Sequence, residues 1–315
     1  MKRPIHLLIA LGLIGALGAC SDDAAEKQAA APIEESTIAA PATTAAPTPT
    51  EPAVVWPAKI VSLSAAATEM LFAIGAGPQV IAVDSLSNFP ADAPVTDISG
   101  FEPNVEAIAA TGTDLVVLSD DLNNVVAGLT ALKIPVVQTP AAKNLDDTYA
   151  QIEQLGAATG HIAEAAEVVK NMQVDIAKIL EDAKSIDQPT GLTVYHELDP
   201  TYFSATSQTF IGQIYSAFGL VNIADKASTS EDGGYPQLSA EYILAADPAL
   251  IFLADVKCCE ATMATVAARD GWAGLSAVTG AGIIELDDDI ASRWGPRVVD
   301  QYRAVAAALA KLPVG

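Results

Sequence analysis

A short pattern that occurs twice, 135 residues apart, constrains the fold of this 315-residue chain more than any other feature. Around Glu106 the chain reads Asn-Val-Glu-Ala-Ile, and the apolar run Leu115-Val-Val-Leu118 begins nine residues after the glutamate. Around Glu241 it reads Ser-Ala-Glu-Tyr-Ile, and the run Leu250-Ile-Phe-Leu253 begins at the same distance. Each copy is typical of an N-cap residue, a short helix and a buried strand. The repetition predicts two similar lobes, each with one carboxylate at a helix start.

Apolar strands and Ala-rich helices alternate on both sides of the middle of the chain. The expected strands cover 59–63, 80–84, 115–118, 134–138, 192–198, 221–225, 250–253 and 282–286. The further expected helices cover 66–74, 145–156, 209–218 and 296–311. Strands separated by helices predict parallel βαβ units. The fold class is therefore α/β, with two βα lobes built on mainly parallel sheets.

Residues 161–184 are predicted to form one long helix between the lobes. Its apolar residues recur at helical spacing, with charged residues between them, and no Pro or Gly interrupts it. At about 1.5 Å per residue such a helix is a rod of roughly 36 Å. The expected domains are an N-terminal lobe at 57–160, this stiff connecting helix, and a C-terminal lobe at 185–315.

The first 20 residues have the features of a secretory signal peptide. Lys2 and Arg3 precede an apolar stretch, and Leu17-Gly-Ala-Cys20 resembles a bacterial lipobox. That resemblance implies cleavage before Cys20 and acylation of its thiol, and the alternative is a signal peptide without lipidation. Residues 21–56 are rich in Ala, Pro and Thr and are expected to form a disordered tether. The mature chain would thus be extracytoplasmic and anchored to the cell membrane.

Composition excludes several classes of function. Removing residues 1–20, which carry two basic and no acidic residues, leaves 14 basic and 39 acidic residues and a net charge of −25. This charge argues against nucleic-acid binding. Two histidines remain, His161 and His196, and no HExxH, CxxC, GxSxG or Walker motif is present. We therefore expect no metal site, no catalytic residues, no enzyme activity and no resident cofactor.

Cys258 and Cys259 are adjacent on a predicted loop directly after the strand at 250–253. Outside the cytoplasm thiols tend to be oxidised, and with Cys20 acylated each has only the other as an intramolecular partner. The pair can form a vicinal disulfide, which would make a rigid turn, or it can remain free.

Several motifs, in a shared order, resemble substrate-binding proteins of bacterial ABC importers. Within that family, the chain is most similar to the class with one helix between the lobes, which carries cobalamin, ferric siderophores or haem, and specifically to its cobalamin-binding branch. The resemblance covers about 58–312. The motifs are Val61-Ser-Leu-Ser64 with Thr68-Glu69, Phe101-Glu-Pro-Asn-Val-Glu106, Asp114-Leu-Val-Val, Asp199-Pro-Thr-Tyr202, Pro236-Gln-Leu-Ser-Ala-Glu241 and Ser292-Arg-Trp-Gly-Pro-Arg297.

The resemblance implies a role for the repeated glutamates. In the cobalamin-binding branch a glutamate on each lobe docks against arginines of the permease, and these positions fall on Glu106 and Glu241. An acid in the first turn also stabilises a helix through its dipole, by roughly 0.3–1 kcal/mol. The dipole explains either glutamate alone, but it does not explain a matched pair. The implied partners are an ABC permease with its ATPase subunits, and the chain itself is expected to be a monomer.

The resemblance also implies a ligand cleft between the lobes, at the carboxyl ends of the strands. Aromatic faces suit a flat macrocycle, and arginines suit its polar edge groups. Where the cobalamin-binding branch often has a Trp before the Glu106 motif, this chain has Gly100 and Phe101. Phe89 and Phe101 can also serve in loop packing. His196 can contact a metal-centred ligand or pack at a strand end. The implied ligand-binding residues are Phe89, Phe101, His196, Tyr202, Tyr235, Arg293, Trp294 and Arg297.

The sequence thus predicts a lipid-anchored, extracytoplasmic protein that delivers cobalamin to an ABC importer. A ferric-siderophore or haem carrier of the same class is the first alternative. A sensory or adhesive surface lipoprotein with the same fold, and a hydrolase with an unrecognised site, are the others.

Overall fold

Two four-stranded parallel sheets organise the part of the chain that the computed structural model describes, residues 55–312. These residues belong to one compact unit of the chain, Ala53–Gly315. The predicted signal peptide, Cys20 and residues 21–54 of the predicted tether lie outside the described residues.

The N-terminal sheet has the strand order β2-β1-β3-β4. Its central strands β1 and β3 are buried along their whole length, as expected for a parallel sheet covered on both faces. The strands are β1 (Ile60–Leu63), β2 (Val80–Val83), β3 (Leu115–Leu118) and β4 (Val136–Gln138). The helices are α1 (Ala65–Ala73), α2 (Val105–Ala110), α3 (Val125–Ala131) and α4 (Leu145–Thr159), with 3-10 turns η1 (Gly77–Gln79) and η2 (Leu122–Asn124).

The C-terminal sheet has the order β6-β5-β7-β8. Its strands are β5 (Thr193–Glu197), β6 (Val221–Asn222), β7 (Leu250–Leu253) and β8 (Ile283–Glu285). The longer helices are α6 (Phe210–Ala217), α7 (Ala240–Ala246) and α12 (Val298–Lys311). Shorter ones are α8 (Val256–Cys259), α9 (Met263–Ala267), α10 (Ser276–Thr279) and α11 (Asp288–Ala291), with 3-10 turns η3 (Ile223–Lys226) and η4 (Trp272–Gly274).

The two sheets are topologically equivalent. Their strand orders coincide when β1 is matched to β5, β2 to β6, β3 to β7 and β4 to β8. The repeated sequence pattern therefore occupies the same place in each lobe, with α2 leading into β3 and α7 leading into β7. The predicted α/β fold with two parallel-sheet lobes is confirmed.

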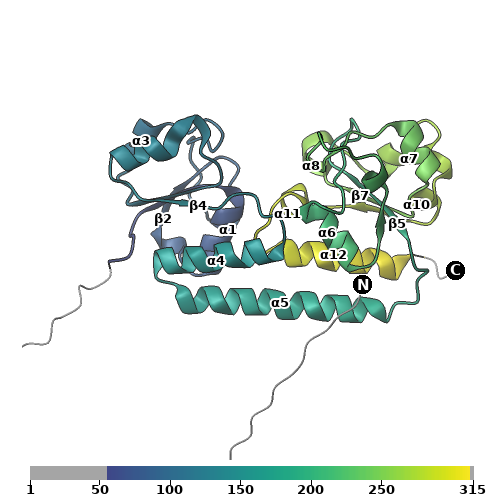
Figure 1. Cartoon of the computed structure of the whole chain (residues 1–315), viewed down its shortest axis with the longest axis horizontal. Coiled ribbons are helices and arrows are strands. Elements are labelled where there is room, and N and C mark those ends of the chain that lie inside the picture. Colours follow the sequence, from purple (N-terminus) through teal and green to yellow (C-terminus); the bar gives the residue numbers. More distant parts are fainter. Residues whose placement is uncertain (1–54, 313–315) are drawn as a thin grey trace, which may run out of the picture. The chain divides into compact units, whose positions relative to one another are not determined.

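A single long helix, α5 (Ile162–Lys184), connects the lobes. It packs against α4 of the N-terminal lobe and α12 of the C-terminal lobe, and Figure 1 shows both helices lying along it. Its buried stripe is Ala165, Val169, Met172 and Ile176. Burial of each larger side chain in this stripe stabilises the fold by about 2 kcal/mol. The stripe belongs to one continuous hydrophobic core that includes residues of both lobes.

Two local expectations from the sequence are wrong. The segment 221–225 is a strand only at Val221–Asn222, because the Asn222 side chain accepts the N–H of Ala224 and starts the 3-10 turn η3. Cys258 and Cys259 lie at the end of the short helix α8 rather than on a loop. The carboxylate of Asp288 accepts hydrogen bonds from three N–H groups at the start of that helix.

Among the described residues, no helix has both the length and the apolar character needed to cross a membrane.

Candidate ligand cleft and docking surface

A cavity of about 470 Å³ lies between the N-terminal lobe and the segment that precedes α12. Its size falls within the range of small-molecule sites, roughly 300–1,000 Å³. It is lined by Leu63, Ser64, Ala65, Ala66, Asp84, Leu86, Gly100, Phe101, Ser119, Asp120, Leu122, Asp289, Ser292, Arg293 and Trp294. Most of the lining residues of the N-terminal lobe directly follow the carboxyl ends of β1, β2 and β3, where ligands of open α/β sheets bind.

The floor of this cavity is built from polar residues that follow the strands. Ser64 caps α1, and its hydroxyl also accepts a hydrogen bond from Ser119 Oγ at 2.7 Å. Asp84 accepts the backbone N–H groups of Leu86 and Ser87, both at 2.9 Å. These bonds hold the loops after the three strands in fixed positions, so the wall of the cavity is preformed.

Gly100 is required by close packing at this wall. A Cβ atom there would lie 2.8 Å from Asp84 Oδ2 and 3.0 Å from the carbonyl oxygen of Leu63. No side chain fits at such distances, so position 100 cannot carry the aromatic residue, and the neighbouring Phe101 lines the cavity instead. The Phe101 side chain is 70% exposed and lines the cavity.

The charge of the cavity is mainly negative. Its lining contains the carboxylates of Asp84, Asp120 and Asp289 and one guanidinium group, that of Arg293. Burial alone would raise the pKa of Asp289, but hydrogen bonds from Lys257 and Asn88 and the charge of Arg293 lower it. Asp289 is therefore ionised at neutral pH, and the cavity presents more negative than positive charge to a ligand.

Both arginines predicted to bind ligand are paired with one buried acid, Glu69 on α1. Arg293 Nη1 lies 2.9 Å from Glu69 Oε1, and Arg297 Nε lies 3.0 Å from Glu69 Oε2. The hydrogen bonds from Arg297 to Glu69 raise the pKa of the guanidinium. Because Glu69 belongs to the N-terminal lobe and the arginines precede α12, these bonds tie the two parts of the molecule together.

The predicted aromatic residues separate into two groups. Phe101 and Trp294 line the cavity, and Trp294 Nε1 donates to Gln151 on α4 at 3.0 Å. Phe89 lies under the guanidinium of Arg297, 4.1 Å from ring centroid to Cζ, and lines a neighbouring hollow. Aromatic side chains thus line both the cavity at Arg293 and the hollow at Arg297.

Tyr202 and Tyr235 lie on paired loops of the C-terminal lobe and do not line the cavity. The ring of Tyr202 stacks on Trp272, with centroids 5.9 Å apart, next to the guanidinium of Arg269. Tyr235 is 41% exposed. Of the two tyrosines, Tyr235 therefore has the more accessible ring.

His196 is buried completely in the C-terminal lobe and cannot reach a ligand in the cleft. Its Nδ1 lies 2.7 Å from the hydroxyl of Tyr215. Burial lowers its pKa to about 3, so the ring stays neutral at physiological pH. The structure thus assigns His196 to strand packing, which was the alternative role, and removes it from the candidate ligand-binding set.

The polar floor of the cavity is not among the ligand-binding residues predicted from the sequence. Ser64, Asp84, Ser119 and Asp120 follow β1, β2 and β3 within two residues. The rule that ligands bind beyond the carboxyl ends of parallel strands would have selected them. Glu69 belongs to the Thr68-Glu69 motif, but no local pattern indicates that Arg293, more than two hundred positions later, pairs with it.

Glu106 and Glu241 occupy equivalent and exposed positions. Each lies in the first turn of its helix, behind an N-cap residue whose side chain accepts a backbone N–H: Asn104 for α2 and Ser239 for α7. In a parallel βαβ unit the helix start lies at the edge where the strands end. Both carboxylates therefore lie at the same edge of their sheets as the cleft. A hydrogen bond from its own N–H, followed by one from Ser239, lowers the pKa of Glu241.

A buried cluster of ionisable groups lies at the ends of β5 and β7. Glu197 receives two hydrogen bonds from Arg269, each 2.6 Å long. The carboxylate of Asp255 is buried and has no hydrogen-bond partner. Burial, followed by the negative charge of Glu197, raises its pKa to about 7. The same influences raise the pKa of Tyr195.

This raised pKa predicts a pH-dependent stability. The folded state holds the proton of Asp255 more tightly than the unfolded state, so the stability it confers is complete below about pH 4 and is lost as pH rises to about 7. We expect Asp255→Asn to change the free energy of unfolding little at pH 4 and to raise it by about 2 kcal/mol at pH 8. Urea unfolding at both pH values measures this difference. Burial of His196 changes the pH dependence of stability in the opposite direction, because it lowers the pKa of that group. Wild type and Asp255→Asn share this effect, so it cancels in the comparison.

The exposed acid Asp270 provides a matched control. Asp270→Asn should leave the free energy of unfolding within about 0.5 kcal/mol of wild type at both pH values. If Asp255→Asn has the same effect at pH 4 and pH 8, the buried carboxyl does not titrate in this range.

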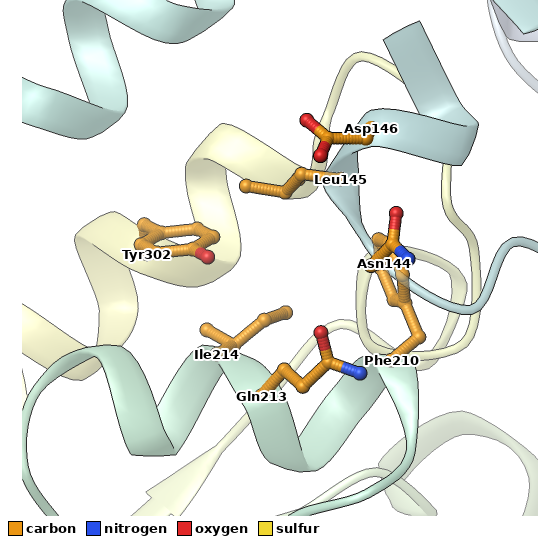
Figure 2. Close-up of a pocket in the computed structure, with 7 residues that line it drawn as sticks. All are labelled: Asn144, Leu145, Asp146, Phe210, Gln213, Ile214 and Tyr302. Carbon is orange, nitrogen blue, oxygen red and sulfur yellow. The ribbon is translucent and has the colours of Figure 1, made fainter. Parts of the chain in front are cut away.

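A second hollow between the lobes, about 230 Å³, lies where α4 begins (Figure 2). It is lined by Asn144, Leu145, Asp146, Phe210, Gln213, Ile214 and Tyr302. Figure 2 shows Leu145, Ile214 and Tyr302 around the hollow, from three different helices. Gln213 Nε2 donates to the carbonyl of Lys143 at 2.7 Å and bridges the lobes there. This volume is below that of most ligand sites, so the larger cavity remains the candidate.

Two α/β lobes on one connecting helix, with a polar and aromatic cavity beside the ends of the strands, define a solute-binding protein. The pattern of the family described as "Periplasmic binding protein" matches residues 60–290. The chain belongs to this family, whose members serve ABC importers as substrate-binding components and are not enzymes. It is thus a binding protein that works outside the cytoplasm.

Two relatives and two solved structures illustrate the range of the family. The chain is 28% identical over 262 residues to the uncharacterised ABC transporter substrate-binding lipoprotein YvrC of Bacillus subtilis, covering 80% of each chain. It is 27% identical to a vitamin B12-binding protein of Pectobacterium carotovorum, covering 82% of this chain and 91% of the relative.

Both solved structures come from Vibrio cholerae. One is the periplasmic vitamin B12-binding protein BtuF (TM-score 0.66, 23% identity, 80% of this chain and 96% of that one). The other is the periplasmic haem-binding protein HutB (TM-score 0.69, 21% identity, 79% and 97%). The two scores are nearly equal, so the fold does not discriminate between these ligands.

Proposed function

We propose that this protein captures a corrinoid of the cobalamin type in the cavity between its lobes and delivers it to an ABC importer. The main support for this proposal is the negative charge of the cavity. Its lining contains three carboxylates and one guanidinium group. That guanidinium, on Arg293, is already bonded to Glu69 and Asp289.

The candidate ligands differ in the groups at their edges. A haem carries two propionates, which like charges at the rim would repel. A corrin ring is surrounded by carboxamide groups, whose N–H donors form hydrogen bonds to carboxylates and hydroxyls. Asp84, Asp120 and Ser119 supply such acceptors, and the exposed ring of Phe101 supplies an apolar face. The edge chemistry of a corrinoid therefore fits this lining better than that of haem.

The relatives add support of a different kind. A protein named for vitamin B12 binding matches over most of both chains, although at 27% identity. Tyr235, on the C-terminal lobe, and Phe89, beside Arg297, would extend the aromatic surface around a large ring.

Delivery requires docking and attachment, and both belong to the proposal. Glu106 and Glu241 would contact cationic residues of the permease, because each lobe exposes one of them at the same sheet edge. Acylation of Cys20 would hold the protein at the membrane surface beside the permease, with residues 21–56 as the tether; Cys20 and most of this segment lie outside the described residues. The chain would act as a monomer, with one cleft for each docking event.

Calorimetric titration of the purified full chain distinguishes the ligands. Cyanocobalamin should bind at one site with near-stoichiometric saturation, whereas hemin and a ferric hydroxamate siderophore should bind weakly or not at all. Binding of hemin or the siderophore without heat from cyanocobalamin or cobinamide would replace the corrinoid assignment with one of the alternatives.

A further inference from the structure

The cysteine pair lies on the exposed surface of α8, immediately beyond β7. Cys258 and Cys259 are joined as a disulfide between adjacent residues, and both side chains are exposed. Exposed disulfides are open to attack by external thiols, and they are the ones that tend to be labile. The pair is therefore accessible to thiol–disulfide exchange in the folded protein.

The short helix α8, which carries the pair, is held by hydrogen bonds and ion pairs to residues at the start of α11. The carboxylate of Asp288 accepts the N–H groups of Val256 at 2.9 Å, Lys257 at 2.9 Å and Cys258 at 3.0 Å. Lys257 Nζ forms ion pairs with Asp287 and Asp289 at 2.8 and 2.9 Å. A helix of four residues has no intrinsic stability, so these bonds and the disulfide ring hold its shape.

Asp289 extends this network of polar contacts to the cleft. Asp289 accepts hydrogen bonds from Arg293 at 2.7 Å and from Asn88 of the N-terminal lobe at 3.0 Å. Arg293 also donates to the carbonyl of Leu86 at 2.9 Å. Leu86, Asp289 and Arg293 line the cavity. A continuous chain of polar contacts thus runs from the cysteine pair to the rim of the cleft and across to the other lobe.

We propose that Cys258–Cys259 is a redox modification site whose state controls how firmly the rim of the cleft is held. The co-reactant is a dithiol, either a small molecule or a protein of the thiol–disulfide oxidoreductase class. Its thiolate attacks one cysteine sulfur, and the other leaves as a thiolate and takes up a proton. The second thiol of the reagent then releases the protein, which becomes a dithiol while the reagent becomes a disulfide.

Reduction opens the ring that restrains the Cys258–Cys259 peptide. The short helix then loses one of its two constraints, and the bonds of Asp288 and Lys257 to it become easier to break. Asp289 binds Lys257 as well as Arg293 and Asn88. When the contacts of Lys257 weaken, the rim of the cleft should therefore loosen as well.

Differential alkylation and hydrogen exchange of the full-length protein test the proposal. Peptide mapping separates Cys258 and Cys259 from Cys20. Before reduction the pair should resist alkylation, and mild dithiothreitol should make both thiols reactive without unfolding the protein. Backbone exchange should then rise on the order of tenfold in 256–260, 287–293 and 86–89, while α5 provides an unchanged internal control.

The double variant Cys258→Ser/Cys259→Ser should show the backbone hydrogen exchange of the reduced protein, and dithiothreitol should not change it. Three results would overturn the proposal: a pair that is alkylated before reduction, a pair that resists dithiothreitol in the folded protein, or faster exchange confined to 256–260. None of these readouts depends on which ligand the cleft binds.

Discussion

Replacing Glu106 and Glu241 together by Ala is expected to abolish ligand uptake while leaving ligand affinity unchanged. Both carboxylates are exposed, and neither lines the cavity, so their removal does not alter the binding site. Docking of a rim charge onto a cationic partner speeds association and fixes orientation, and two such contacts set the register of both lobes. Loss of both should reduce uptake to near background, a loss of at least tenfold, and each single variant should have an intermediate effect.

Uptake of radiolabelled ligand, in cells that contain the cognate permease and ATPase but lack this protein, measures the effect. Glu164→Ala is the matched control, because Glu164 is also an exposed acid in the first turn of a helix, α5. That control loses the same interaction with a helix dipole, worth roughly 0.3–1 kcal/mol, and should transport normally. Normal uptake by the double variant would show that these glutamates serve only their helices.

Replacing Glu69 by Gln should strongly destabilise the protein. The Glu69 side chain is 2% exposed, and it faces two guanidinium groups that are themselves largely buried. Removing one partner of a buried ion pair leaves an uncompensated charge and typically costs about 3–5 kcal/mol. For a protein of this size each kcal/mol corresponds to about 2–4 °C, so the melting temperature should fall by roughly 10 °C.

Glu181→Gln provides the comparison, because Glu181 forms an exposed ion pair with Lys184. Such pairs contribute about 0–1 kcal/mol, and the melting temperature should hardly change. Replacing Glu69, Arg293 and Arg297 together by Met should recover much of the stability, since Asp289, which loses Arg293, still pairs with Lys257 and no other charge of the cluster remains. Equal melting temperatures for Glu69→Gln and Glu181→Gln would contradict the structural role assigned to this ion-pair cluster.

The fold could be predicted from the sequence because its signals are local. N-cap residues such as Asn104 and Ser239 precede apolar runs that become β3 and β7, and the unbroken helical pattern at 161–184 becomes α5. The duplicated order of these signals implied two equivalent lobes. Ends of elements were less predictable, because side-chain bonds such as that of Asn222 to Ala224 decide them.

The site was predictable only in part, because its members are brought together by tertiary structure. Phe101, Trp294 and Arg293 do line the cavity. Arg297, in contrast, lies on Glu69, a partner 228 residues away. His196, at a strand end, points into the core because its ring bonds to Tyr215. Periodicity shows which residues form strands or helices. The burial of the His196 ring, however, depends on its hydrogen bond to Tyr215, and no local pattern in the sequence indicates that partner.

Competition between cyanocobalamin and hemin for the cleft tests the central claim most directly. Equilibrium titration of the full chain should give one cyanocobalamin per protein, with no displacement by an excess of hemin. Phe101→Ala should weaken binding about tenfold, as expected for loss of an aromatic face, while Leu132→Ala, an exposed apolar residue outside the cavity, should have no effect. Tighter binding of hemin than of cyanocobalamin, or equal affinities in wild type and Phe101→Ala, would contradict a corrinoid in this cleft.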